Sequence, residues 1–125
     1  MINLGYTGLG ALAADPENTA YVISKTGLLL LTRAYADRLG PRGIRVNMVS
    51  PGQLENSVDL PEGFGERVPL GRAGRLGDVV AAALYLASPE ASYVTGQNLE
   101  IAGGYMMRLR DDRGDGLGGG APEEG

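Results

Sequence analysis

The spacing of apolar and polar positions predicts three short strands and two helices in this 125-residue chain. Residues 2–4 are typical of a short strand, residues 44–49 alternate with the period of two that strands favour, and residues 97–101 form a third such segment. Helices are predicted over residues 20–39 and 78–87. The order strand, helix, strand, helix, strand indicates parallel strands joined by crossover helices, which is an α/β fold.

Turn-forming residues set the expected ends of these elements. Asn18 or Thr19 can cap the first helix, and Gly40, followed by Pro41, should end it. Residues 53–75 are polar and contain two prolines, so we expect a long excursion there, of the kind that is usually functional. The sequence predicts a folded unit over residues 1–106 and a disordered tail of glycine and charged residues over 107–125.

Composition narrows the possible functions. The net charge of −4 argues weakly against nucleic acid or an anionic membrane as a partner. The chain has no cysteine and no histidine, so thiol chemistry and the commonest metal ligand are missing, and we expect no metal. Its start lacks the pattern of a signal peptide, and no apolar run reaches the roughly 20 residues that span a bilayer. The expected location is therefore the cytoplasm.

One pair of residues stands out as candidate chemistry. Lys25 is the single lysine among eleven basic residues, and it follows Tyr21 by four positions within the first predicted helix. Positions four apart lie on one face of a helix. An ammonium group about 5 Å from a phenol favours the phenolate by roughly 3 kcal/mol at an effective dielectric of about 20. The spacing therefore suits proton transfer, although a surface lysine beside a partly buried tyrosine is the plainer interpretation.

The surrounding motifs favour the chemical interpretation. The stretch "AYVISKTGLLLLTRAYADRLGPRGIRVNMVSPG" resembles the catalytic helix and following strand of the short-chain dehydrogenase/reductase family. The similarity continues through "PLGRAGRLGDVVAAALYLAS" to "SYVTGQNLEIAGGY", so that it covers about residues 1–105. It implies an incomplete Rossmann-like doubly wound sheet, with the last three strands and their crossover helices present and the N-terminal nucleotide-binding half missing.

The resemblance also implies roles for particular residues. Tyr21 would donate a proton to a carbonyl or C=N substrate, and Lys25 would hold the nicotinamide ribose and promote ionisation of the tyrosine. The cofactor would be NADP or NAD, with NADP preferred, although the residue that selects between them is absent. The nicotinamide end of that cofactor would contact Asn47, Pro51, Gly52 and Leu54 in addition to Tyr21 and Lys25, and residues 53–75 would match a mobile substrate loop.

Two features depart from that family. The serine that polarises the carbonyl is replaced by Gly8, so that Thr7 or Tyr6 substitutes for it or the role is lost. We take Thr7 as the candidate third catalytic residue. The stretch "GLGALA", residues 8–13, loosely fits a dinucleotide-binding fingerprint, but too short a strand precedes it and Asp15-Pro16 interrupts the segment after it.

The leucine run at residues 28–31 makes the first helix apolar almost all round. The resemblance implies that this helix, residues 20–39, pairs with a second copy in a homo-oligomer. For the substrate, the loop residues resemble reductases of the pteridine type, and a 3-oxoacyl carrier-protein reductase is the other close resemblance. A competing hypothesis is a truncated, non-catalytic remnant that retains only the dimerisation helix.

Overall fold

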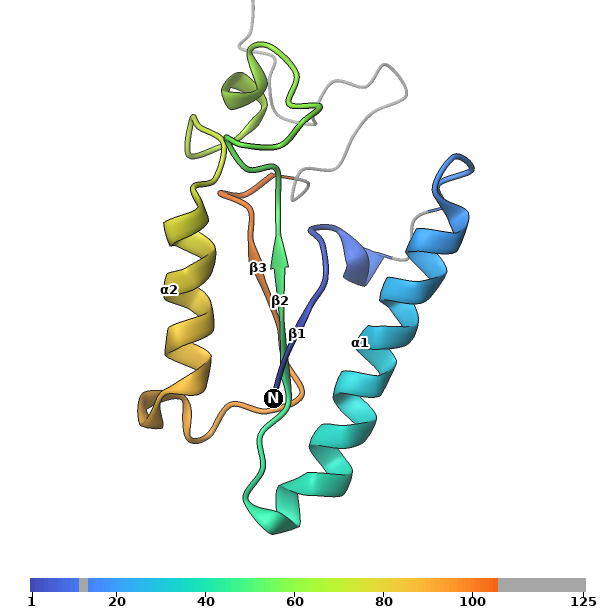
Figure 1. Ribbon diagram of the computed structural model, residues 1–125, viewed down its shortest axis with the longest axis vertical. Coiled ribbons are helices and arrows are strands. Elements are labelled where there is room, and N and C mark those ends of the chain that lie inside the picture. The colour runs from blue at the N-terminus through green and yellow to red at the C-terminus, as the bar shows by residue number, and fades with distance from the viewer. Residues whose placement is uncertain (12–13, 106–125) are drawn as a thin grey trace, which may run out of the picture.

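The computed structural model describes residues 1–11 and 14–105. Its strands are β1 (Ile2–Leu4), β2 (Asn47–Pro51) and β3 (Asn98–Ile101), and its α-helices are α1 (Thr19–Leu39) and α2 (Leu76–Ala87). The strands are parallel in the order β1-β2-β3, with α1 on one side of the sheet and α2 on the other (Figure 1). This arrangement confirms the α/β prediction. The tail predicted to be disordered, 107–125, lies outside the described residues.

The central strand forms the core of the sheet. Met48 and Val49 are completely buried because β2 has a strand on each side and a helix over each face. The predicted strand at residues 44–49 is wrong by about three residues, since β2 begins at Asn47. Val46 is buried but pairs with a turn: its N–H donates to the Thr95 hydroxyl, and its carbonyl accepts from Gly96. The alternation of apolar and polar residues therefore begins at residue 44, before the first residue that pairs in β2.

Helix α1 packs one face on the sheet and leaves another open. Leu29, Thr32 and Ala36 are buried, whereas the side chains of Leu30 and Leu31 are 61% and 51% exposed. The leucine run thus lies on both faces of the helix, as its sequence suggested. The hydroxyl of Thr32 accepts a hydrogen bond from the Asn3 amide at 3.0 Å, which ties the helix to β1.

Helix α1 ends at Leu39, before Gly40, as predicted, whereas its start is organised by a residue that the sequence did not indicate. Asn18 takes the cap position but makes no cap hydrogen bond with its side chain. Asp15 organises this end instead, because its carboxylate accepts the backbone N–H groups of Glu17 and Asn18. At the other end Gly40 keeps a right-handed helical conformation and begins a short 3₁₀ turn. Gly43, with φ of 72°, ends that 3₁₀ turn in the left-handed conformation.

The segment between β2 and α2 is more structured than the predicted excursion over 53–75. It contains a 3₁₀ helix at Phe64–Arg67, and Leu54 pairs with Gly74 in a parallel bridge. The ring of Phe64 meets Tyr105 edge-on at 5.0 Å between centroids, so this segment packs over the exit from β3.

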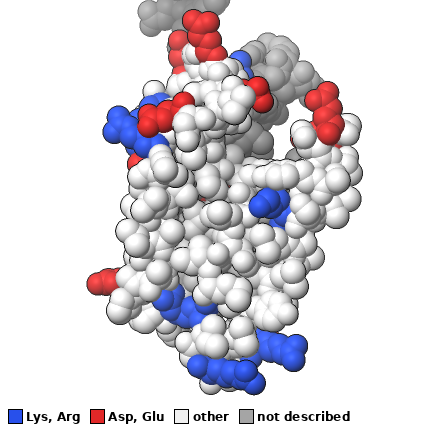
Figure 2. Space-filling model, in the orientation of Figure 1, with Lys and Arg blue, Asp and Glu red and all other residues white. Residues whose placement is uncertain are grey.

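Among the described residues, no helix is long and apolar enough to cross a membrane. The face seen in Figure 2 carries few charged side chains between its two ends.

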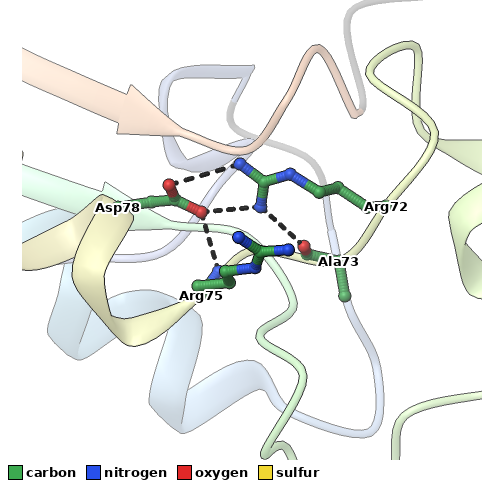
Figure 3. Close-up of polar contacts among 4 residues, drawn as sticks. All are labelled: Arg72, Ala73, Arg75 and Asp78. Carbon is green, nitrogen blue, oxygen red and sulfur yellow. Dashed lines mark hydrogen bonds and ion pairs between the residues drawn. The ribbon is translucent and has the colours of Figure 1, made fainter.

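An acidic residue holds the start of α2. The Asp78 carboxylate accepts a hydrogen bond from the Arg75 backbone N–H at 2.8 Å and pairs with both terminal nitrogens of Arg72, at 2.7 and 3.3 Å (Figure 3). The helix begins at Leu76, two residues before the predicted start at residue 78. The hydrogen bond from Arg72, together with the bond from the Arg75 backbone, lowers the pKa of Asp78 to about 2.

Asp78→Asn should lower the melting temperature by a few degrees at neutral pH. The wild-type carboxylate ionises more readily in the folded than in the unfolded chain, so its contribution is complete above the unfolded pKa near 3.8 and disappears as the pH falls through about 2. Thermal melts followed by circular dichroism at pH 7 and pH 2 measure the difference between the two proteins. A difference that stays the same at both pH values contradicts this account.

Candidate active site

Tyr21 and Lys25 lie beside the carboxyl end of β1. The ammonium group of Lys25 donates a hydrogen bond to the carbonyl oxygen of Leu4 at 2.8 Å. The Lys25 nitrogen is also 5.7 Å from the centroid of the Tyr21 ring. Tyr21 is 49% exposed. Lys25 and the buried Thr32 are seven positions apart on α1, so they share a face, and each contacts β1. The two contacts fix where the helix presents Tyr21.

A second phenol adjoins the first. The Tyr6 ring lies 5.4 Å from the Tyr21 ring between centroids, with the planes tilted by 38°. On its other side Tyr6 packs against the buried cluster of Leu9, Leu29 and Met48. Burial, followed by the nearby charges of ionised Tyr21 and Asp15, raises the pKa of Tyr6. The Tyr6 phenol is therefore held by the core and stays protonated well above neutral pH.

The turn after β1 is tied to β3 by a carboxylate. Glu100 accepts the Thr7 hydroxyl at 3.0 Å and the Gly8 backbone N–H at 3.2 Å. Gly8 has φ of 83°, a conformation that residues with a side chain rarely adopt. The structure thus directs the Thr7 hydroxyl proton to Glu100.

The end of β2 completes this edge of the sheet. The carbonyl of Pro51 accepts the Thr7 backbone N–H at 3.0 Å, and the Gly52 N–H donates to the Ile101 carbonyl at 2.9 Å. A Cβ atom on Gly52 would stand 3.0 Å from the Cβ of Ala102, so glycine permits this close approach. Leu54 follows two residues later, where it pairs with Gly74. Pro51, Gly52 and Thr7 therefore come together, and Leu54 lies close to them in sequence.

Asn47 is the predicted site residue that the structure places elsewhere. It is paired with Ile2 at the amino end of β2, and its side chain is 1% exposed. Its amide donates to the Val94 carbonyl at 2.9 Å and accepts the Gln97 N–H at 3.1 Å. These contacts join β2 to the turn before β3, and they do not favour a contact between Asn47 and a cofactor.

Sequence reasoning missed Glu100. It is 93 residues from Thr7, and nothing in the local pattern of β3 marks it. Arg45 belongs to the motif "RGIRVN", but its type and spacing predict no role; its guanidinium donates to the carbonyls of Leu86 and Ser88 at the end of α2. A shallow hollow, lined in part by Met1, Ile2 and Ile44, lies at the opposite end of the sheet from Tyr21 and Lys25 and brings no reactive pair together.

The described residues fit the nicotinamide end of a dinucleotide. Ligands of open α/β sheets bind at the carboxyl ends of the strands, which is where Lys25 contacts the end of β1 and Gly52 follows β2. An ammonium group has three donors, and Leu4 takes one of those of Lys25. The pyrophosphate end has no matching helix among residues 1–11 and 14–105: α1 starts well after β1, and Asp78 already occupies the N-terminal turn of α2.

Comparison with known proteins identifies the family. A family model described as enoyl-(acyl carrier protein) reductase matches residues 1–106. The 3-oxoacyl-[acyl-carrier-protein] reductase FabG of Thermotoga maritima is 43% identical over 99 residues, which are 74% of this chain and 40% of that protein. An uncharacterized short-chain type dehydrogenase/reductase of Sinorhizobium fredii is 40% identical over 107 residues, or 78% of this chain and 20% of that protein.

Solved structures agree with these relatives. The acetoin dehydrogenase from Enterobacter cloacae superposes with a TM-score of 0.71 at 31% identity, over 85% of this chain and 42% of that one. The chain belongs to the short-chain dehydrogenase/reductase family of oxidoreductases. Its sheet corresponds to part of that family's Rossmann-like fold, and it spans less than half the length of each of these relatives.

Proposed function

We propose that this chain supplies the tyrosine–lysine part of an active site that transfers hydride between a nicotinamide cofactor and a carbonyl or C=N substrate. The observation that carries the proposal is the position of Lys25, which reaches Leu4 at the carboxyl end of β1 while its ammonium group lies 5.7 Å from the Tyr21 ring. A lysine that only made the surface soluble would extend into solvent, whereas Lys25 is hydrogen-bonded to the carbonyl of Leu4.

In the direction of reduction, a bound NADPH or NADH supplies the hydride to the carbonyl carbon. Tyr21 donates its phenolic proton to the carbonyl oxygen, which becomes the hydroxyl of the product. Lys25 places its positive charge 5.7 Å from the centroid of the Tyr21 ring, where it can also hold the cofactor. Since Tyr21 is half exposed, it can recover a proton from solvent. The net change is the addition of a hydride and a proton to one C=O bond.

Three residues at the edge of the sheet would receive the nicotinamide end. Pro51 is the last residue of β2 and Gly52 follows it, and Leu54 adds an apolar side chain close by in the sequence. The donors of Lys25 that Leu4 does not use suit the two hydroxyls of a ribose. Asn47 is left out of this proposed contact set because its amide is already engaged. We keep NADP as the first cofactor to test and NAD as the second.

The choice of substrate is guided by relatives. Pteridine-like compounds and 3-oxoacyl compounds are the two sequence-based alternatives. The names of the relatives, a 3-oxoacyl reductase and an acetoin dehydrogenase, support a carbonyl substrate. A small ketone is therefore the first class to assay.

Self-association through α1 is part of the same proposal. Ile23, Leu30, Leu31 and Tyr35 leave 44% to 65% of their side chains exposed along this helix. A second copy of α1 could cover them in a two-fold pair. Sedimentation velocity at about 100 µM should show a dimer or larger species. At this concentration a helix pair with a dissociation constant in the micromolar range is mostly formed. A monomer contradicts this part.

The proposed function is tested by ligand-induced stabilisation. NADPH at about 100 times its dissociation constant should stabilise the folded chain by roughly 2.7 kcal/mol, which raises the melting temperature by about 10 °C. Lys25→Met should remove most of this shift. Arg33→Met, which deletes an exposed positive charge from the same helix, is the matched control and should keep it.

The outcomes separate the two hypotheses. A shift that depends on Lys25 supports a cofactor site in this chain. A melt that neither NADPH nor NADH moves favours the non-catalytic alternative, in which only the association surface of α1 is used.

A further inference from the structure

We propose that Glu100 is a positioning residue of the site. Its carboxylate holds the turn that carries Tyr6, and the Tyr6 ring in turn fixes the ring of Tyr21. The inference rests on the proposed function and adds to it a residue of β3, the strand that does not pair with β1. Glu100 contacts no reacting atom in this account and acts only through the turn.

The chain that leaves β1 crosses the end of β2 to reach β3. Glu100 pairs with Ser50 in the register of β2 and β3, and Gly5 lies on the other side of Ser50. A Cβ atom on Gly5 would collide with the Ser50 side chain, so the glycine lets the chain stay close to the sheet. Two residues later the Thr7 N–H donates to the Pro51 carbonyl at 3.0 Å, which brings the turn within reach of Glu100.

Glu100 binds this turn at two points. One carboxylate oxygen accepts the Thr7 hydroxyl at 3.0 Å, and the other accepts the Gly8 backbone N–H at 3.2 Å. Because the two bonds end on different oxygens and on adjacent residues, they fix the orientation of the turn as well as its position. Gly8 has φ of 83°, so the backbone conformation in which both bonds form is one that favours glycine.

The same turn carries the ring that meets Tyr21. Tyr6 directly precedes Thr7, and its ring lies 5.4 Å from the Tyr21 ring between centroids. Tyr21 is half exposed, so the Tyr6 ring is a neighbour that limits where its side chain can move. A turn released from Glu100 would let Tyr6, and with it Tyr21, take other positions. A misplacement of about 1 Å in an active site can lower the rate by about 10²-fold.

The test measures the contact between the two rings by NMR, on the whole chain without cofactor and with ¹³C-labelled tyrosine. Tyr6→Phe and Tyr21→Phe identify the two ring signals, and the wild-type chain should show a nuclear Overhauser cross-peak between them. Glu100→Val keeps a residue that suits a strand but has no acceptor, so the cross-peak should be largely lost. Glu100→Gln should retain it, because its amide oxygen can accept the Gly8 N–H and its amide nitrogen can donate to the Thr7 oxygen.

Two more variants complete the test. Asp37→Ala removes an exposed carboxylate near the other end of α1 and should leave the cross-peak unchanged. Glu100→Thr has a side chain too short to reach the turn, so it should act like Glu100→Val and takes its place if that variant does not fold. Both bonds of Glu100 are exposed, so we expect the variants to remain folded, which circular dichroism melts measure.

The outcomes separate this inference from the proposed function. A wild-type chain without the cross-peak overturns the inference, as does a cross-peak that survives in folded Glu100→Val or Glu100→Thr, or one that Asp37→Ala also loses. Turnover of acetoin with NADPH is measured separately: its absence counts against the proposed function, whereas the cross-peak still decides the role of Glu100. Where turnover occurs, Glu100→Val should lower kcat by about 10²-fold with KM changed less than about twofold, and Glu100→Gln should restore most of kcat.

Discussion

Tyr21→Phe should lower kcat for reduction of a ketone by NADPH by roughly 10²–10⁴-fold, which is the usual contribution of a positioned general acid. The ring and its contact with Tyr6 are retained, so the fold and the approach of the substrate should change little. Only the proton that the carbonyl oxygen receives is lost. The measurement is the steady-state consumption of NADPH, with acetoin as the ketone, at several substrate concentrations.

Tyr35→Phe provides the control for this experiment. Tyr35 lies on the same helix and is 44% exposed, so it reports any general effect of removing a phenol from α1. It should leave kcat within a factor of about two, a range that corresponds to only about 0.4 kcal/mol. If Tyr21→Phe behaves like Tyr35→Phe, then Tyr21 is not the proton donor. A rise in KM with an unchanged kcat would instead assign Tyr21 to binding.

The elements were predictable because they depend on short-range spacing, and the same spacing places Tyr21 and Lys25 on one face of α1, where the family resemblance makes them candidate site residues. The period of α1 and the four-residue step from Tyr21 to Lys25 are visible in any window of the sequence. The structure adds the partner that the spacing could not name, the Leu4 carbonyl, which lies 21 positions before Lys25. Local pattern therefore found the residues, and the parallel pairing of the strands decided what they face.

Long-range contacts explain the parts that could not be predicted. The sequence offers Thr7 as a candidate hydroxyl for the substrate, and in the fold Glu100 on β3 accepts a hydrogen bond from that hydroxyl. Asn47 shares a motif with Pro51 and Gly52, yet it lies at the other end of the same strand and serves the turn before β3. Neighbours in a motif can thus serve opposite ends of a sheet.

The construction of α1 links these observations to function. Lys25 and Thr32 contact β1, Leu29 and Ala36 fill the core, and the remaining apolar positions face outward. The helix that carries Tyr21 therefore also leaves Ile23, Leu30, Leu31 and Tyr35 largely exposed. If a second copy covers that face, association would stiffen the helix that carries Tyr21, and the proposed chemistry and the proposed oligomer would depend on one element.

Arg45→Met should destabilise the folded chain by about 2–4 kcal/mol, lowering its melting temperature by more than about 10 °C. The Arg45 guanidinium donates to the Leu86 carbonyl at 2.7 Å and the Ser88 carbonyl at 3.2 Å, with a longer contact of 3.4 Å to Val94. The last carbonyls of a helix have no partner within it. A positive charge there is also attracted by the negative end of the helix dipole. Methionine keeps much of the stem but leaves these part-buried oxygens unpaired.

Two further variants make this prediction specific. Arg45→Lys retains the charge but loses the fork that reaches several carbonyls at once, so it should recover only part of the stability. Arg42→Met removes an exposed arginine from the neighbouring 3₁₀ turn and should shift the melting temperature by no more than a few degrees. Equal melting temperatures for Arg45→Met and Arg42→Met would contradict the role given to Arg45. The expected order would instead mean that Arg45, two residues before the central strand, holds the end of α2 and the turn that leads into β3.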